Sequence, residues 1–262
     1  MSHLSKILYR AFVAATLFFL VAPVIAIIPM SFSSGEFFIY PLPGFSLGWY
    51  GEILSDARWQ RAFANSLAIG VGSAAIATVL GTLAALSLVH MRSLFSRIAF
   101  GLLLLPMLVP VVIVSVSLFF FYSRLGLVGT RTGLILGHAT LGLPFVVVTV
   151  LATLRNYNFT LDRAALSLGA GRLRTFFTVT LPLIAPGVLS GAVFAFAVSL
   201  DEVVVTLFLA SPEHTTLPRE IFSGIRESIS PAVVAAATVT IGLSCGLLGL
   251  LAFIRHAFAR AT

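Results

Sequence analysis

The sequence of 262 residues contains one cysteine, one lysine and few charged side chains of any kind. Because Cys245 has no second cysteine to pair with, a disulfide framework and intramolecular dithiol redox chemistry are excluded. A phosphate-binding P-loop needs a lysine directly after its glycines, and Lys6 follows none, so ATP hydrolysis by that motif is excluded. The five histidines are isolated and show no paired-ligand spacing, which predicts no metal site.

Apolar residues make up most of what remains. They account for 59% of the chain against 10% charged residues, and the mean hydropathy is +1.08. Soluble domains lie nearer one half apolar and one quarter charged. This composition excludes a water-soluble enzyme and a disordered chain. The net charge of +7 is divided among short loops, so it is interpreted as a signal of membrane orientation and not of nucleic-acid binding.

Six apolar segments are long enough to cross a hydrocarbon core, which takes about 20 helical residues. They are 11–31, 62–89, 98–122, 133–154, 183–207 and 232–254. The first is longer than the apolar part of a secretory signal peptide, so we expect it to remain as a helix. The prediction is an all-α, polytopic membrane protein with six transmembrane helices, in which residues 1–262 form a single domain.

Basic residues gather on one side of these segments. That side holds Lys6, Arg10, Arg92, Arg97, Arg155, Arg163, Arg172, Arg174, Arg255 and Arg260, with Asp162 as its only acid. The connections on the opposite side hold six basic and eight acidic residues. Because basic residues concentrate in cytoplasmic loops, both termini and the loop at 155–182 are predicted to be cytoplasmic.

The loop at 155–182 has more structure than a connector needs. Two short helical patterns flank Gly169 and Gly171, Asp162 supplies an acid to the first turn, and Pro182 is expected to end the second pattern. The loop also carries the apolar residues Leu166, Leu168, Leu173, Phe176 and Phe177. Apolar side chains are costly in water, so we predict that they pack on a partner protein. The alternative is a self-packed loop at the membrane surface.

This loop resembles the EAA loop of binding-protein-dependent ABC importer permeases. That pattern is E-A-A, three residues, G and, about a dozen residues later, L-P; here it reads Arg163-Ala164-Ala165, Gly169 and Leu181-Pro182. The family's glutamate falls on Arg163, which reverses the charge. Further likeness to the second permease of spermidine/putrescine systems lies in NSL at 65–67, LLP at 104–106, LPFVVVTV at 143–150, SLDEVVV at 199–205 and LPREIF at 217–222.

The resemblance implies a half-transporter whose cytoplasmic loop docks on a separate ATPase and transmits its closure to the membrane helices. The residues implied in this coupling are Asp162, Arg163, Ala164, Ala165, Leu168, Gly169, Ala170 and Arg172. The implied partners are a second permease subunit, two ATPase subunits, a periplasmic substrate-binding protein and membrane lipid, with no nucleic acid. The chain is then no enzyme and binds no cofactor itself, since ATP and magnesium belong to the ATPase subunits. The implied location is the bacterial inner membrane.

Asp201 and Glu202 are acids at the end of the otherwise apolar fifth segment. Asp201 lies about 27 Å along a helix from Leu183, near the outer edge of the hydrocarbon. Carboxylates at that depth are costly unless they face water or a cation, so we predict that they attract a cationic substrate. The alternative is a solvated pair or a structural pair with an arginine. His138 is a further candidate for the substrate pathway, and an interhelical hydrogen bond is its alternative role.

The predicted function is therefore a permease subunit for polyamines such as spermidine and putrescine. One alternative is the same architecture carrying another small solute, such as an aminophosphonate, a sulfur-containing anion or iron. Anion carriers are expected to place basic residues where Asp201 and Glu202 stand. A second alternative is an ATP-independent channel or membrane scaffold, which leaves the apolar surface of the cytoplasmic loop unexplained.

Overall fold

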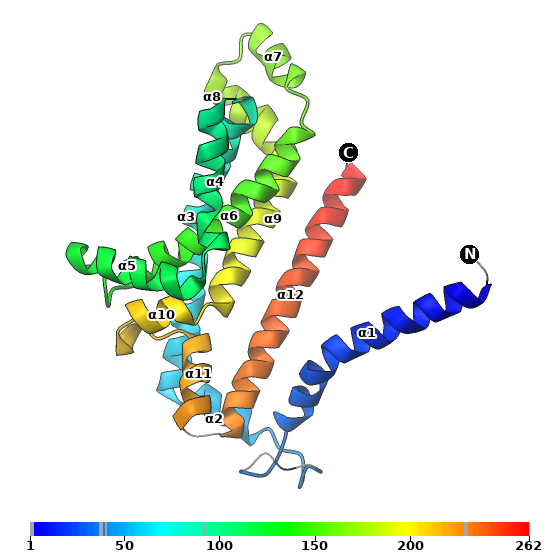
Figure 1. Ribbon diagram of the computed structural model, residues 1–262, viewed down its shortest axis with the longest axis vertical. Helices are drawn as coiled ribbons and strands as arrows, with labels where there is room; N and C mark the ends of the chain where they lie inside the picture. Colours follow the sequence, from blue (N-terminus) through cyan, green and yellow to red (C-terminus); the bar gives the residue numbers. More distant parts are fainter. Residues whose placement is uncertain (1–2, 37–38, 40, 92, 228–229, 262) are drawn as a thin grey trace. The chain divides into compact units, whose positions relative to one another are not determined.

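The computed structural model describes residues 3–36, 39, 41–91, 93–227 and 230–261. Of the charged residues used to predict the orientation, Arg92 lies outside the described residues, as do the side chains of Glu227, Arg255 and Arg260. The described part of the chain is built of helices, with one isolated bridge between Ser33 and Phe45 and no strand (Figure 1). The prediction of an all-α fold is confirmed.

The helices follow one another through the whole described chain. They are α1 (His3–Met30), α2 (Gly48–Ser55), α3 (Ala57–His90), α4 (Leu94–Leu108), α5 (Val111–Leu125), α6 (Arg131–Arg155), α7 (Thr160–Ser167), α8 (Arg172–Thr175), the π-helix η1 (Phe176–Thr180), α9 (Leu181–Asp201), α10 (Val204–Leu209), the 3-10 helix η2 (Pro212–His214), α11 (Leu217–Glu227) and α12 (Pro231–Ala261).

Five of these helical segments are long and apolar enough to cross a membrane. They are Ser5–Met30, Ala57–His90, Arg131–Arg155, Arg172–Asp201 and Pro231–Phe253. The pair α4 and α5 also passes the test when taken together, which brings the number to six. The described residues therefore form a multi-pass membrane protein, as the composition predicts.

The predicted third span, 98–122, is wrong as a single helix. It is broken between α4 and α5, which are bent by 104° relative to each other, and α5 runs crosswise to α4 in Figure 1. Val109, at the break, is extended, with φ −83° and ψ 137°. The ring of Pro110 disfavours a helical conformation at the residue before it, and Pro110 has no N–H to continue the helical hydrogen bonds.

The predicted fifth span, 183–207, has different ends in the structure. Its helix stops at Asp201, Glu202 is extended with ψ 115°, and a separate short helix, α10, follows. At its other end Pro182 does not stop the preceding helix, because α8, η1 and α9 run on as one helix from Arg172 to Asp201. In an α-helix the ring of Pro182 would clash with the carbonyl of Thr178. The π-turn lies at this point and widens the helix there.

The chain divides into two compact units. One comprises Met1–Gln60 and Ile221–Leu243, and the other comprises Arg61–Glu220 and Ser244–Thr262. In the first unit, the Trp49 indole donates a hydrogen bond of 2.8 Å to the carbonyl of Ser33, and the hydroxyls of Ser31 and Tyr50 lie 2.7 Å apart. These contacts tie α2 to the end of α1.

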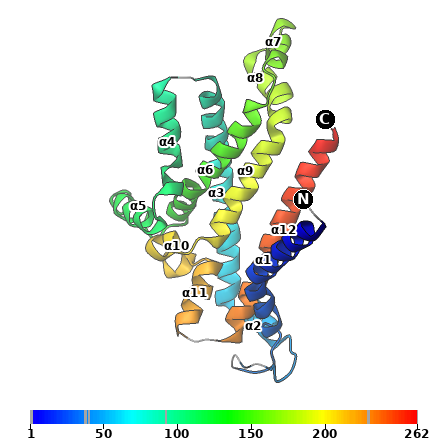
Figure 2. The ribbon, with the colours of Figure 1, turned by 45° about the vertical axis from the view of Figure 1, so that its right-hand side comes forward.

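The second unit is built around α6 and α9, which lie side by side in both views (Figures 1 and 2). Their shared core contains the fully buried residues Ala77, Val146, Val150, Leu154 and Ile184. The two helices approach so closely that a Cβ added at Gly142 would lie 2.9 Å from the Cβ of Ala195. Small residues permit this close packing of helices in lipid, where burial of apolar surface contributes little.

Candidate functional site

The predicted helix-turn-helix is present in the second unit, beyond the ends of α6 and α9 (Figure 1). Helix α7 ends in a Schellman motif, in which the N–H of Gly169 bonds to the carbonyl of Leu166 and the N–H of Ala170 bonds to that of Ala165. Gly169 has a φ of +87°, a conformation that side chains other than glycine adopt at a cost. The turn between α7 and α8 therefore depends on the glycine that the sequence pattern singles out.

Asp162 fixes the position of α7 against the neighbouring helices. Its Oδ1 accepts a 2.6 Å hydrogen bond from the Tyr157 hydroxyl and a 3.0 Å hydrogen bond from the Thr180 hydroxyl. Tyr157 follows the end of α6, and Thr180 is the last residue of the π-turn before α9. The carboxylate thus joins α7 to both flanking segments, so we assign Asp162 a positioning role within the loop.

Burial and the neighbouring carboxylate both act on Tyr157. Burial disfavours the charged phenolate, and its hydroxyl donates a hydrogen bond to Asp162; together these raise the pKa of Tyr157 to about 12. The phenol therefore remains protonated and able to donate at every physiological pH.

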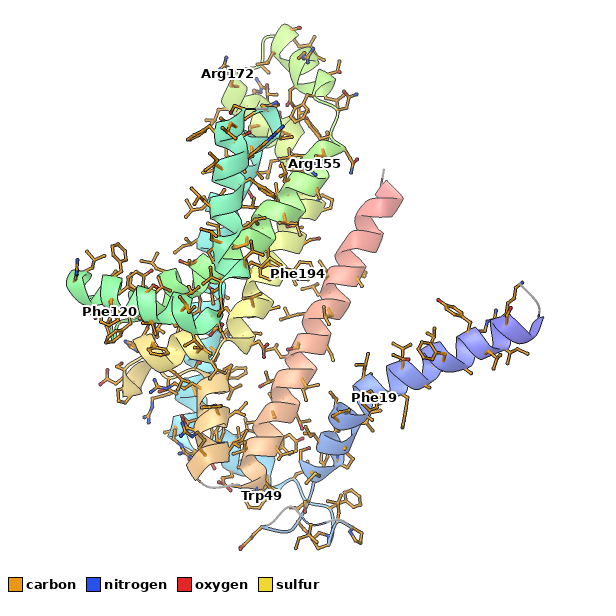
Figure 3. The ribbon with its side chains drawn as sticks, in the orientation of Figure 1. Phe19, Trp49, Phe120, Arg155, Arg172 and Phe194 are labelled. Carbon is orange, nitrogen blue, oxygen red and sulfur yellow. The ribbon has the colours of Figure 1, made fainter. Side chains whose placement is uncertain are left out.

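The outer face of the loop is apolar and exposed. The side chains of Leu168, Leu173 and Phe177 are 89%, 75% and 58% exposed, and we call these three residues the apolar loop surface. Arg163 and Arg172 are exposed beside it, and Figure 3 shows Arg172 at the same end of the unit as Arg155. No other described residue covers the apolar loop surface.

The remaining predicted loop residues differ in exposure. Ala164 is exposed, whereas Ala165 and Ala170 are half-buried. The carbonyl of Arg163 accepts a hydrogen bond from the Ser167 hydroxyl, and the Arg163 side chain is exposed.

Asp201 and Glu202 lie at the opposite end of α9 and have different surroundings. The Oε1 of Glu202 accepts a 2.9 Å hydrogen bond from the N–H of Val205, which caps the first turn of α10. Asp201 is exposed, and its carboxylate accepts no hydrogen bond from any other described residue. Glu202 is therefore occupied by a structural contact, whereas Asp201 faces outward.

His138 is enclosed within its own unit and is only 1% exposed. Its Nδ1 lies 2.7 Å from the Ser199 hydroxyl on α9, and its Nε2 lies 3.2 Å from the Thr206 hydroxyl on α10. This is the interhelical hydrogen bonding that the sequence left open as an alternative. We assign His138 a structural role in joining three helices.

Three polar residues that the sequence analysis did not assign hold the segment after α10. The Asn65 amide donates to the carbonyls of Glu213 and Thr215, and the Ser66 hydroxyl accepts from the N–H of Leu217. Arg131 in turn donates to the Asn65 side-chain oxygen at 3.2 Å. Asn65 and Ser66 belong to the NSL segment at 65–67, but nothing in that local pattern indicates that their partners lie about 150 residues away.

The helix-turn-helix and Asp201 lie at the two ends of one helix. The continuous helix from Arg172 to Asp201 has 30 residues, which corresponds to about 45 Å. No described group of three or more His, Cys, Asp or Glu side chains is placed to hold a metal ion. One continuous helix therefore connects the helix-turn-helix to Asp201.

The described residues thus combine several membrane-spanning helices with a helix-turn-helix beyond the ends of α6 and α9. The family of binding-protein-dependent transport system inner membrane components matches residues 77–259, and the chain belongs to that family. It is 35% identical over 250 residues to the putrescine transport system permease protein PotI of Escherichia coli (strain K12), covering 93% of this chain and 88% of that protein. It is 34% identical over 241 residues to the spermidine/putrescine transport system permease protein PotC of the same strain, covering 92% and 91%.

Solved structures share the fold at lower sequence identity. A bacterial ABC transporter involved in the import of the acidic polysaccharide alginate matches with a TM-score of 0.74 at 18% identity, over 98% of this chain and 99% of that one. The MetNI methionine ABC transporter in an inward-facing conformation matches with a TM-score of 0.56, over 77% and 93%. The first of these likenesses extends the fold assignment across nearly the whole chain.

Proposed function

We propose that this chain is one transmembrane half of an ATP-driven importer that carries polyamines such as putrescine and spermidine across the bacterial inner membrane. The observation that carries the proposal is the identity of 34–35% to two polyamine permeases along more than nine-tenths of the chain. The other half is a second permease subunit, and a periplasmic binding protein delivers the solute.

The energy for transport comes from two partner ATPase subunits, which hold ATP and magnesium. The apolar loop surface supports this assignment, because Leu168, Leu173 and Phe177 are exposed at one end of the unit and suit a partner groove. Arg163, Ala164 and Arg172 lie exposed near it and contribute to the same contact. With this loop and both termini in the cytoplasm, Asp201 faces the periplasmic side.

Asp201 is the residue proposed to attract the solute. A polyamine is a flexible polycation, and an exposed carboxylate at the mouth of a pathway raises the local concentration of such a cation. Glu202 strengthens the negative potential there while its carboxylate holds the start of α10. A carrier of anions would gain nothing from these two acids, which favours the polyamine over the anionic solutes.

The test is the ATPase activity of the reconstituted importer with its binding protein, loaded with spermidine, with putrescine or with no solute. Stimulation by the loaded binding protein is expected, together with uptake of the polyamine into vesicles. ATPase activity that no polyamine stimulates would reject the solute while leaving the importer architecture intact.

The docking surface is tested separately with Leu168→Asp, which places a charge on an exposed apolar side chain without altering the Schellman motif. We expect this variant to lose ATPase binding. Asn158→Asp is the matched control, since it adds the same charge in the same loop and keeps the side-chain oxygen that caps Thr160. Equal ATPase binding by the two variants would reject the apolar loop surface as the docking site.

A further inference from the structure

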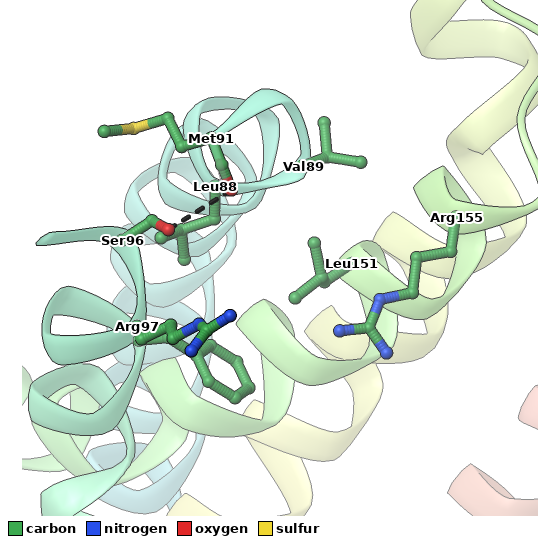
Figure 4. A pocket seen from close by; sticks show the side chains of 8 residues that line it. Leu88, Val89, Met91, Ser96, Arg97, Leu151 and Arg155 are labelled. Atoms are coloured by element: carbon green, nitrogen blue, oxygen red, sulfur yellow. Dashed lines mark hydrogen bonds between the residues drawn. The ribbon is translucent and has the colours of Figure 1, made fainter. Parts of the chain in front are cut away.

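A cavity of about 350 Å³ lies between the end of α3, the start of α4 and the end of α6 (Figure 4). Its lining residues are Leu88, Val89, Met91, Ser96, Arg97, Phe100, Leu151 and Arg155. Figure 4 shows Arg97 and Arg155 on different walls of the cavity, with Leu151 between them. The cavity therefore presents two cations within an otherwise mostly apolar lining.

Neither arginine is neutralised by the described part of the chain. The side chains of Arg97 and Arg155 form no ion pair or hydrogen bond with any described residue. The acid of the nearby loop, Asp162, is engaged by Tyr157 and Thr180. The Ser96 hydroxyl is also engaged, because it donates to the carbonyls of Met91 and Ser93. The two guanidinium groups are thus the groups available to a ligand, and they select an anion.

The cavity lies at the level where a membrane span meets water. Arg155 is the last residue of the span Arg131–Arg155, and Arg97 stands in the first turn of α4. Beside Arg97, the side chains of Leu94, Phe95 and Ile98 are 71%, 70% and 53% exposed. Exposed apolar residues next to unpaired arginines are typical of the boundary between acyl chains and headgroups.

We propose that this cavity binds the phosphate group of an anionic phospholipid. The planar guanidinium forks of Arg97 and Arg155 match the oxygens of a phosphate, and the apolar walls accept the glycerol and the first acyl carbons. The acyl chains continue along Leu94, Phe95 and Ile98. The same two cations repel a polyamine, so this site is distinct from the solute pathway and does not depend on which solute is transported.

A bound lipid here has a mechanical consequence. It bridges the start of α4 to the end of α6, directly before the segment that carries Tyr157 and α7. The lipid therefore stabilises the base from which the helix-turn-helix projects.

The experiment measures lipid retention by the full chain, using native mass spectrometry after incubation with equal amounts of phosphatidylglycerol and phosphatidylcholine. Wild-type protein is expected to retain phosphatidylglycerol preferentially. The double variant Arg97→Gln/Arg155→Gln is expected to lose that preference by about tenfold or more. Arg10→Gln/Arg174→Gln removes two exposed cations that do not line the cavity, and it is expected to retain the wild-type preference.

Several results would overturn the proposal. An unchanged preference in Arg97→Gln/Arg155→Gln, or an equal loss in the control variant, would show that the cavity does not select the lipid. Displacement by inorganic phosphate at matched concentration would indicate a site for a free anion, and release on assembly with the ATPase would indicate a partner carboxylate. Arg97→Lys/Arg155→Lys keeps both charges. Partial retention of phosphatidylglycerol by this variant would show that Arg97→Gln/Arg155→Gln loses binding and not folding. None of these readouts involves transport, so failure of the lipid site leaves the proposed function standing.

Discussion

One carboxylate oxygen of Asp162 accepts two hydrogen bonds, one of 2.6 Å from the Tyr157 hydroxyl and one of 3.0 Å from the hydroxyl of Thr180, which lies 18 residues after Asp162. One side chain thereby connects the segment that enters the helix-turn-helix to the segment that leaves it. Asp162, which directly precedes the position of the family's glutamate, thus acts within this chain, whereas Arg163 at that position is exposed.

Removal of this connection should loosen α7. In Asp162→Ala both hydrogen bonds are lost, and we expect amide hydrogen exchange across 160–168 to accelerate by about tenfold, since such bonds contribute about 1 kcal/mol or more. Ser167→Ala is the control, because its hydroxyl bonds only to the carbonyl of Arg163 in its own helix. Equal exchange in Asp162→Ala and wild type would contradict the positioning role.

Alkaline pH should weaken the same connection. The pKa of Tyr157 is raised from 10.0 to about 12, so the folded protein holds this proton more tightly than the unfolded chain does. The resulting stability is fully present below pH 10 and is lost as the pH rises toward 12. Thermal unfolding measured across that interval should show a steeper loss of stability for wild type than for Tyr157→Phe. Identical slopes for the two proteins would contradict the raised pKa.

Asp201→Asn should lower polyamine uptake at subsaturating solute by roughly three- to tenfold, because an exposed carboxylate steers cations toward the pathway. The effect should shrink as ionic strength rises, since the interaction is screened. Initial uptake rates into vesicles at low and high salt measure both features. Glu52→Gln, a change at another exposed acid, serves as the comparison. Normal uptake by Asp201→Asn at low salt would remove the residue from the solute pathway.

His138→Phe should destabilise the protein by roughly 1–2 kcal/mol, because it leaves the buried hydroxyls of Ser199 and Thr206 without this partner. A lower midpoint of thermal unfolding in detergent is the expected result. Ser117→Ala removes an exposed hydroxyl that bonds only within its own helix, so its midpoint should remain close to wild type. A stable His138→Phe protein with impaired transport would instead favour a role for this histidine in the pathway.

Gly142→Val should disrupt the packing of α6 against α9. A Cβ at this position would approach Ala195 to 2.9 Å at its Cβ and 3.2 Å at its Cα, and the backbone contact leaves little room to relax. Overpacking of this kind costs about 1–3 kcal/mol. Gly101→Val is the matched control, since no neighbouring atom lies within 4 Å of the added Cβ. The two variants should differ clearly in the yield of folded protein, and similar yields would contradict the close packing.

The sequence predicted best those features that depend on composition and local chain chemistry. Apolar length located five spans, and Gly169 marked the turn because a left-handed residue is needed there. The break at Pro110 was within reach of the same reasoning, because a proline acts on the residue directly before it. The prediction that Pro182 ends a helix is wrong, because a proline directly after a π-turn can be accommodated inside a continuous helix.

Contacts between distant residues were beyond prediction from one sequence. Nothing local to Asp162 indicates that Thr180 shares its carboxylate, and nothing local to His138 names Ser199 and Thr206 as its partners. These pairs depend on how helices pack, which a single pattern of apolar residues does not specify. The cavity between Arg97 and Arg155 is of the same kind, since it joins residues from helices that are separate in the chain.

The π-turn at Phe176–Thr180 also determines how the long helix tolerates changes in its length. A π-turn contains one residue more than the α-turn that it replaces, so deletion of one residue within it keeps the later side chains on the same faces of the helix. The same deletion places Pro182 in a regular α-helix, where its ring clashes with the carbonyl four residues earlier. The same deletion in the middle of α9 would turn every later side chain by about 100° around the axis and carry Asp201 to another face. The extra residue of the π-turn therefore has two effects: it leaves room for Pro182, and it sets which face of the helix Asp201 occupies.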